Sequence, residues 1–547
     1  MHLLIECGDQ DLKQFFEHDA RKNAHYRCTT AISELIQAIN THLETRMLDQ
    51  IRKSHFFSIT ADESCNISTV EELSICARLL NNGKPEEHFL KLIPVDRTDA
   101  ATIASTIKAF PDQNNLLATK MRAIGLDGAA AMSGVRTGVQ ARLRCHSPLA
   151  IYIHCRCHQL QLACVYAAKM IKTVSRVQSN ILAIWKVFHY SPKKAAVLRE
   201  IQAVLAHPQL KMLKPGDTRW LSHRNSVHAI RRSFSPLVVA LESIYEEDGD
   251  AEAFGLAKLV KSYNFIATVS MLCDALDPVA RLSTALQAKA LDFAELSFLV
   301  DTCTADLQAM MNSPNEATEY FKMIDTLLLT ELKEWDLQVS DQMKSKFKQE
   351  ILTPYFKHLI DNINGRFEDS RGIITALSIF DPRHLPEKDS ELRDYGLQQM
   401  NVLLDYYGTA RSLELNSATV AVLPDLDKDD TLAEWRIFKR HLYNRFNSVS
   451  AQDMTATVVA SESQCLMFPN VVKLLRIYQV IPLTTATVER SFSTLKLVKT
   501  NLRNRLKDSM LDWCMRIAIE GPDSLSDEDI AAIIQIWKEK RTRRLLL

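Results

Sequence analysis

The chain has 547 residues, enough for a large core or several packed domains, and its 46% apolar and 24% charged residues are ordinary for a globular protein. Its net charge is zero, so nucleic-acid binding would have to come from local basic patches rather than from an overall field. No apolar run approaches the roughly 18 residues needed to span a bilayer, and Glu6 interrupts the N-terminus too early for a signal peptide.

The first part of the chain predicts a helical segment followed by a mixed sheet. Residues 1–54 carry apolar positions at helical spacing, and the β-prone run 56–61 ends at Asp62. Strict alternation predicts a second strand over 73–79, and Asn81-Asn82-Gly83 is a turn signal. The following elements are expected to be a strand at 89–93, a helix at 100–110, a strand at 123–126 that ends at Asp127, and a strand at 151–153.

The middle of the chain is predicted to be a stack of helices. No glycine occurs between Gly255 and Gly365, and apolar residues there recur at helical spacing. This block is expected to extend from about 165 to 410. Residues 415–465 are rich in Asp, Ser and Thr and predict a polar linker, and the chain is expected to become helical again from Val471.

Two acidic residues directly follow strands and are candidates for chemistry. Asp62 and Asp127 each end a buried-looking strand, where a sheet presents side chains to a cleft. Paired carboxylates can share Mg²⁺ ions, which activate water and stabilise the leaving oxygen in phosphodiester cleavage. Because Asp is also common at strand ends for purely structural reasons, this pattern alone leaves both interpretations open.

A basic helix near the C-terminus carries a third acid. Glu489 lies in the first turns of a helix that is predicted to begin near Thr485, where the helix dipole also favours an acid. The segment from Ala486 to Lys507 contains six basic residues and one acidic residue, for a net charge of +5. Such a stripe can follow a phosphate backbone or can simply be a solvated face. Its candidate DNA contacts are Arg490, Lys496, Lys499 and Arg503.

A second basic window runs from Lys211 to Arg232 and contains Arg219 and Trp220. An exposed Trp beside an Arg can stack on an unpaired base, whereas a core position is the structural alternative. Cys and His residues gather in His154-Cys155-Arg156-Cys157-His158. Zinc is not expected there, because neighbouring ligands such as His154 and Cys155 cannot all converge on one ion.

Five segments in order resemble the hAT superfamily of DNA transposases and their descendants. The last one, continued through Leu506, resembles the family's C-terminal dimerisation signature and is the most specific. The segments are Ser58-Ile59-Thr60-Ala61-Asp62-Glu63-Ser64, Gly125-Leu126-Asp127-Gly128-Ala129-Ala130-Ala131-Met132-Ser133-Gly134, Cys155-Arg156-Cys157-His158-Gln159-Leu160, Thr218-Arg219-Trp220 and Thr485-Ala486-Thr487-Val488-Glu489-Arg490-Ser491-Phe492-Ser493.

The resemblance implies a helix-rich α/β fold, in which an RNase H-like mixed sheet is interrupted by a large all-α insertion. The implied domains are an N-terminal helical segment (1–54), the first part of the core (55–165), a helical insertion (166–470), and a core-completing helix with the dimerisation region (471–547).

The resemblance also implies site residues. Asp62, Asp127 and Glu489 match the acidic triad, which would hold Mg²⁺ or Mn²⁺ in an active enzyme. Cys155 and His158 match a Cys-x-x-His element near the active site, and Trp220 matches a Trp placed near DNA bases.

One departure from the family pattern concerns the N-terminus. Members usually carry a BED-type zinc finger, whereas Cys7 and Cys28 lack paired partners. We therefore expect a domesticated protein that dimerises and binds DNA; the alternative is an active metal-dependent transposase, and a third is a helical scaffold unconnected to DNA. The sparse cysteines predict a reducing compartment, and Lys540-Arg541-Thr542-Arg543-Arg544 resembles a nuclear import signal or a solvated tail.

Overall fold

The computed structural model describes residues 28–215, 220–288, 293–368, 372–415, 418–447 and 449–540. The chain divides into two compact units. The first consists of Met1–Tyr152, Ala410–Leu423 and Arg476–Leu547, and the second of Ile153–Thr409 and Pro424–Leu475.

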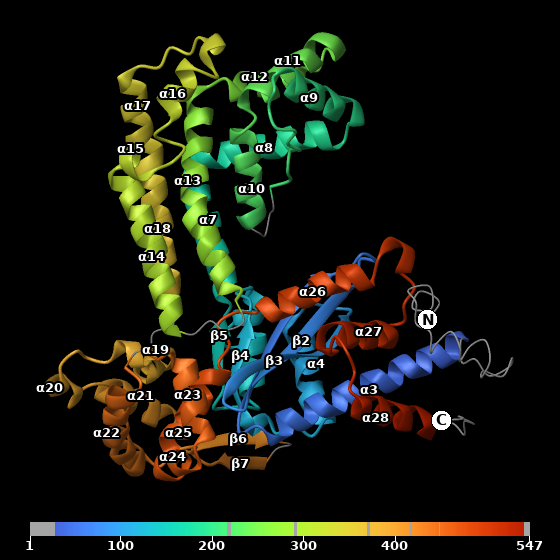
Figure 1. The fold of residues 1–547 in the computed structure, drawn as a ribbon, viewed down its shortest axis with the longest axis vertical. Coiled ribbons are helices and arrows are strands. Elements are labelled where there is room, and N and C mark those ends of the chain that lie inside the picture. The colour runs from blue at the N-terminus through green and yellow to red at the C-terminus, as the bar shows by residue number, and fades with distance from the viewer. Residues whose placement is uncertain are drawn as a thin grey trace. The chain divides into compact units, whose positions relative to one another are not determined.

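The first unit is built on a mixed five-stranded sheet with the order β3-β2-β1-β4-β5 (Figure 1). β1 pairs antiparallel with β2 and parallel with β4, and β2 pairs antiparallel with β3. The strands are β1 (Phe57–Cys65), β2 (Glu71–Asn81), β3 (Lys84–Val95), β4 (Met121–Leu126) and β5 (Ile151–His154). The predicted turn joins β2 to β3, and its Asn82 and Gly83 both have positive φ.

The helices of this unit cover both faces of the sheet. They are α3 (Thr29–Lys53), α4 (Ala100–Gln113), the 3₁₀ turn η2 (Ala118–Lys120), α5 (Ala130–Ser133), α6 (Val139–Arg144), α26 (Ala486–Val498), the 3₁₀ turn η7 (Asn501–Arg503), α27 (Asp508–Glu520) and α28 (Asp527–Glu539). A small antiparallel hairpin, β6 (Arg411–Leu415) and β7 (Ala418–Val422), also belongs to it. Because α26 begins about 400 residues after β1 ends, this unit is completed by helices from late in the sequence.

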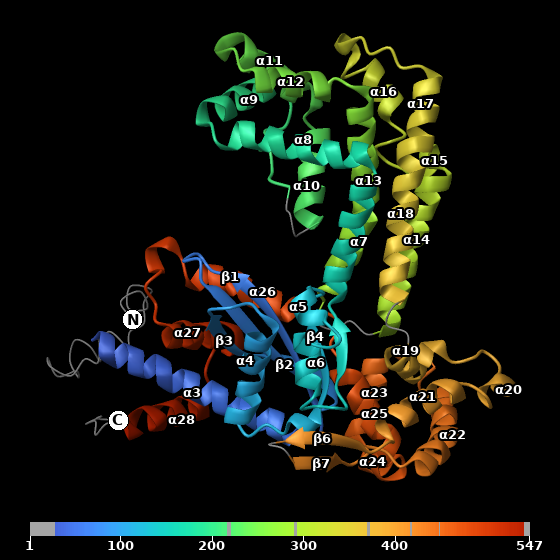
Figure 2. The same ribbon diagram turned by 180° about the vertical axis from the view of Figure 1, so that it is seen from behind.

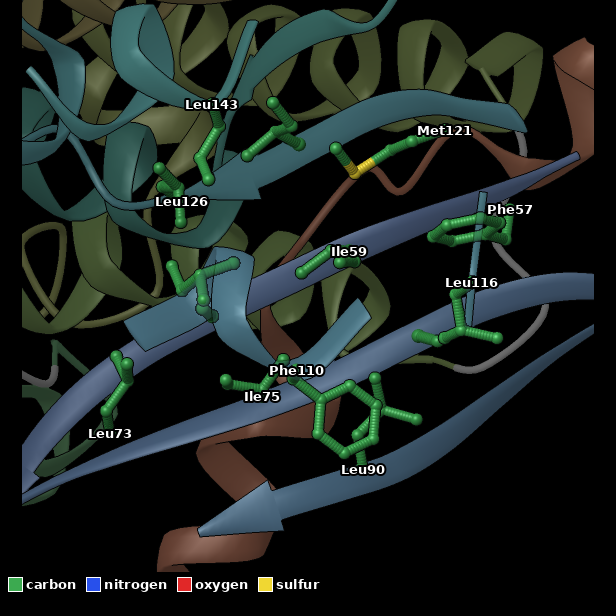
Figure 3. Close-up of a cluster of buried hydrophobic side chains, with 14 of the residues drawn as sticks. Phe57, Ile59, Leu73, Ile75, Leu90, Phe110, Leu116, Met121, Leu126 and Leu143 are labelled. Carbon is green, nitrogen blue, oxygen red and sulfur yellow. The ribbon is translucent and has the colours of Figure 1, made fainter. Parts of the chain in front are cut away.

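The main apolar core lies on one face of the sheet. The odd-numbered side chains of β1 and β2, such as Ile59 and Ile75, pack there against Phe110 of α4 and Leu143 of α6 (Figure 3). On the opposite face, Val488, Phe492 and Leu495 of α26 pack with strand residues and with α27. Figure 2 shows α4 and α6 on the near side of the sheet, and Figure 1 shows α26 and α27 on the other.

The outer edge of β3 is covered by side chains of α27. The Asp512 carboxylate accepts a hydrogen bond from the Leu92 amide (2.9 Å), and Glu520 accepts one from the Phe89 amide (2.6 Å). Between them the buried Arg516 donates to the Leu90 carbonyl and to Asn40 of α3. One stripe of α27 at four-residue spacing therefore satisfies backbone groups that an edge strand otherwise leaves open.

The described part of the second unit is mainly helical. Its helices include α7 (Arg156–Met170), α8 (Lys172–His189), α9 (Pro192–Val204), α10 (Trp220–Arg231), α11 (Phe234–Asp248), α12 (Ala251–Val260), α13 (Tyr263–Leu286), α14 (Phe293–Asn312), α15 (Pro314–Ala317), α16 (Ile324–Leu329), α17 (Asp341–Phe347), the π-helical turn η4 (Lys348–Leu352) and α18 (Thr353–Glu368). They continue with α19 (Ile373–Leu377), α20 (Asp389–Leu392), α21 (Leu397–Tyr407), α22 (Lys428–Arg445), α23 (Ala451–Ala460), α24 (Glu462–Met467) and α25 (Pro469–Val480), with short 3₁₀ turns at Lys333–Trp335, Ser378–Phe380 and Pro382–His384. The long helices α7, α13, α14 and α18 run beside one another (Figure 1).

The expected α/β sheet with a large helical interruption is therefore present. The polar linker predicted near 415–465 is wrong, because α22, α23 and α24 occupy most of that stretch. Its acidic run is the start of a helix: Asp427 caps α22 by accepting from the Asp430 amide, and Asp429 and Asp430 lie in its first turn.

Candidate functional site

Asp62 lies within β1, on the face that α26 covers. It is directly opposite Ser74 of β2. The Ser74 hydroxyl is 2.7 Å from that of Ser491 on α26, two residues after Glu489. Directly opposite residues of an antiparallel pair point to the same face of the sheet. Asp62 and the helix that carries Glu489 therefore share one face.

Asp127 follows β4 directly, as predicted. The last parallel pair between β1 and β4 joins Thr60 to Gly125, and Asp62 and Asp127 each lie two residues further on. Because side chains alternate along a strand, the register directs both aspartates to the same face. Asp127 accepts a hydrogen bond from the Ala129 amide at 3.0 Å, and its carbonyl accepts one from the Tyr152 hydroxyl at 2.6 Å.

The first turn of α26 is fixed to the sheet by a polar network. Arg78 of β2 donates to the Gln479 carbonyl (2.9 Å) and pairs with Glu87 of β3 (2.8 Å). Glu87 in turn accepts from the Thr487 hydroxyl, which also accepts from Arg490. These contacts set the rotation of the helix about its axis and hence the direction of Glu489.

Asp62 and Asp127 lie on the face covered by the helix that carries Glu489, but the described residues show no ready metal site. In the described part of the chain, no group of three or more His, Cys, Asp or Glu side chains is placed so that it could hold a metal ion. The role of Asp62, Asp127 and Glu489 in binding Mg²⁺ or Mn²⁺ stays a prediction.

Glu63 is an acid of this region that was not predicted as a site residue. It lies next to Asp62 and therefore on the opposite face, continuing the core-facing row of Ile59 and Ala61. Burial, with smaller contributions from the charges of Asp127 and Glu71, raises the pKa of Glu63 to about 7. Its Oε2 is buried without a hydrogen-bond partner among the described residues. A carboxyl group at the end of an otherwise apolar strand face was the signal that could have revealed it.

Cys155 and His158 lie at the start of α7 in the helical unit. The buried Cys155 precedes the first turn, and its carbonyl accepts from the Gln159 amide at 3.0 Å. The rings of His154 and His158 are 5.8 Å apart. Burial, followed by electrostatic interactions with His158, Arg156 and Arg366, lowers the pKa of His154 to about 4, so this histidine is neutral at physiological pH.

The residues predicted to contact DNA differ in their exposure and in their ion pairs. Lys499 is 6% exposed and lies 3.9 Å from Glu72, and Arg490 is directed toward Glu87 at 4.0 Å. Lys496 and Arg503, by contrast, are exposed. Arg219 lies outside the described residues, and Trp220 is the first residue of α10.

Comparison with protein families gives two matches. Residues 1–138 match the RNase-like domain of ZMYM1/FAM200, and residues 455–518 match the hAT family C-terminal dimerisation region. The resemblance to the hAT family is confirmed. In this hAT-like chain, Asp62 and Asp127 lie in the first match and Glu489 in the second, so the two matched segments meet where α26 packs on the sheet.

Two curated relatives are similar over most of the hAT-like chain. The mouse protein named 52 kDa repressor of the inhibitor of the protein kinase is 23% identical over 92% of this chain and 68% of its own length. The human protein of the same name is 22% identical over 92% of this chain and 67% of its own length. Among the described residues, no helix is both long and apolar enough to span a membrane.

Proposed function

We propose that this hAT-derived chain associates with itself through its C-terminal segment and acts in the nucleus as a DNA-binding protein that no longer transfers DNA strands. The match of residues 455–518 to a dimerisation region carries the proposal. The relatives' name, which describes a repressor, supports a regulatory role over a catalytic one.

Light scattering across a range of micromolar concentrations tests self-association directly. A mass that rises to twice that of one chain supports the proposal, and a strict monomer throughout contradicts it. The same samples serve for the DNA experiments, so that folding and assembly are known before binding is measured.

DNA binding is expected to depend on the exposed basic residues that follow the middle of α26. Lys496 and Arg503 are exposed, as are Arg505 and Lys507 in the loop before α27. Replacing Lys496 and Arg503 with Ala should weaken binding to any sequence and flatten its salt dependence, by about 0.9 per lost phosphate contact in the double-logarithmic slope. Lys84→Ala, at an exposed position of β3, is the control. Binding that is insensitive to salt and to both replacements would contradict this part.

The second candidate function is a metal-dependent DNA transposase or nuclease. It is favoured by the position of Asp62 and Asp127 on the face of the sheet that α26, the helix carrying Glu489, covers. Nicking of supercoiled DNA in Mg²⁺ or Mn²⁺ that Asp127→Asn abolishes would establish it. If folded, self-associating protein does not nick DNA, the result supports the non-catalytic function.

The nuclear location is a separate prediction. Residues 541–544 of the basic C-terminal run lie outside the described residues. A fluorescent fusion that loses nuclear enrichment when Lys540, Arg541, Arg543 and Arg544 are all replaced by Ala would support it. Equal signal in nucleus and cytoplasm for the unaltered fusion would contradict it.

A further inference from the structure

An open cavity of about 360 Å³ lies beside the C-terminal half of α26. One wall is the end of β1 and the turn after it, including Cys65 and Ile67, and the other is formed by α26 and the residue after it, through Phe492, Leu495, Lys496 and Lys499. Phe492 and Leu495 are 5% and 3% exposed and form an apolar floor. The volume is far above the roughly 30 Å³ that one water occupies in the liquid, so a branched aliphatic side chain fits.

A fully exposed leucine lies next to this cavity. Leu502 is 101% exposed, in the 3₁₀ turn that follows α26, only three residues beyond the cavity-lining Lys499. Ile67, on the rim, is 51% exposed. A single exposed leucine is ordinary, but an apolar projection adjoining an apolar hollow is typical of an interaction surface.

The two sides of this surface have opposite charge. Residues 496–507 contain five basic residues and no acid. Of the three acids in residues 63–72, Glu72 is 1% exposed and Glu63 faces the core, whereas Glu71 is partly exposed. Within one chain, Lys499 already lies 3.9 Å from Glu72. In a symmetric pair, the basic turn of each copy would face Glu71 of the other, and this pairing of opposite charges favours the correct orientation.

We propose that Leu502 of one copy inserts into the cavity of a second copy, and that the second copy's Leu502 does the same in return. This proposal rests on the self-association proposed above and names its contact. A two-fold interface needs the projection and the hollow on one self-complementary patch, and their separation by three residues meets that requirement. Both lie in or against the segment that matches the dimerisation region.

The lining has an apolar floor and a basic rim. The floor formed by Phe492 and Leu495 matches the side chain of leucine, whereas the donors available to a phosphate are on Lys496 and Lys499. Nucleic acid bound by this basic segment would depend on Lys496 and Arg503 and would not require Leu502. Replacement of Leu502 is therefore expected to weaken self-association and to leave DNA binding unchanged.

The first experiment measures the dimer dissociation constant by analytical ultracentrifugation. Leu502→Ala should raise it about 100-fold, because the symmetric pair loses two buried anchors and each is expected to contribute about tenfold. Leu466→Ala is the control, since Leu466 is 77% exposed and belongs to the same matched segment. It should leave the constant unchanged. Equal constants for Leu502→Ala and the unaltered chain overturn the proposal while self-association stands, and a monomer throughout overturns both.

The second experiment traps the contact through the native Cys65, which is exposed and lines the cavity. Tagged protein with Leu502→Cys and Cys65→Ser is mixed with untagged protein that retains Cys65 and Leu502. Cys514, which lies near Arg503, is replaced by Ser in both. Oxidised glutathione accepts the two electrons as the disulfide forms.

A disulfide between tagged and untagged chains is expected, because the thiol introduced by Leu502→Cys would enter the partner's cavity. Two chains that both carry Cys65→Ser should not cross-link. If single chains with Leu502→Cys and an intact Cys65 form only an internal disulfide, and the mixture gives no cross-linked pair, the turn closes on its own cavity and the proposal is wrong.

Discussion

The Asp512 carboxylate accepts a hydrogen bond of 2.9 Å from the Leu92 amide, on the edge of a sheet 420 residues earlier in the chain. Together with Arg516 and Glu520 it makes α27 a cover for that edge. The matched dimerisation region therefore has a role within a single chain, because it completes the fold that begins with α3. Self-association through this segment must leave these contacts intact, which points to the turn before α27 rather than to α27 itself.

Removal of the Asp512 carboxylate should destabilise the sheet unit. Asp512→Ala leaves the buried amide of Leu92 without its acceptor and removes one of the acidic partners of the buried Arg516, which retains Glu44 at 3.5 Å. We expect a loss of about 1–3 kcal/mol in the free energy of unfolding. Urea denaturation measures it, and hydrogen exchange at Leu92 should accelerate. Asp523→Ala, at an exposed position of the loop after α27, should be neutral. Equal effects of the two replacements would show that the edge contact contributes nothing.

Glu63 should make stability depend on pH. Its pKa is raised from its usual value of 4.5 to about 7, so the folded state holds a proton that the unfolded state has released. Stability from this group is therefore present below about pH 4.5 and is lost as the pH rises to about 7. Glu63→Gln should remove this loss, so that the variant gains stability relative to the unaltered chain as the pH rises through that window. Parallel profiles for the two proteins in urea denaturation would contradict the prediction.

Asp274 should stabilise the helical unit by capping a backbone segment. Its carboxylate, 3% exposed, accepts from the amides of Glu319, Tyr320 and Phe321 at 2.7, 2.9 and 2.8 Å. Asp274→Ala should cost about 2–5 kcal/mol, since three amides lose their acceptor. Asp274→Asn should cost less, because one oxygen already accepts two of the three bonds. Thermal unfolding measures the order, and Asp361→Ala, exposed on α18, is the control.

Gly125 should tolerate no side chain. A Cβ there would lie 2.9 Å from Cγ2 of Thr60 and 3.1 Å from Cγ of Pro482. Gly125→Ala should therefore destabilise the unit by about 1–3 kcal/mol through overpacking. Gly255→Ala in α12 is the matched control, since nothing lies within 4 Å of its Cβ position, and it should be neutral or stabilising by up to about 1 kcal/mol. If both replacements behave alike in urea denaturation, the close packing of β1 against β4 does not restrict this glycine.

The strands were predictable because their signals are local. Alternation along β2 and the turn at Asn82 and Gly83 depend on neighbouring residues only, and both are confirmed. The prediction of a linker near 415–465 is wrong because acidic residues are typical of loops and equally of helix starts, and Asp427 and its neighbours favour a helix start. Composition alone did not distinguish a solvated loop from a well-capped helix.

The site was predictable in its parts but not in its geometry. The motifs identified Asp62 and Asp127 at neighbouring strands, and the register places them on one face. The partners of Lys499 and Arg490 could not be predicted from the sequence, because Glu72 and Glu87 are more than 400 residues away along the chain. The distribution of charge along α26 predicted a uniform basic stripe. Tertiary contacts instead bring some of its basic residues close to acids of the sheet and leave others exposed.

The edge of β3 has a consequence for synthesis of the protein. Leu92 leaves the ribosome 420 residues before Asp512, a delay of roughly 20–80 s at the usual elongation rates of about 5–20 residues per second. During that interval the nascent sheet carries an open hydrogen-bonding edge, which can pair with other nascent chains on the same messenger RNA. Chaperone occupancy is expected to concentrate on this strand until the last helices have been translated.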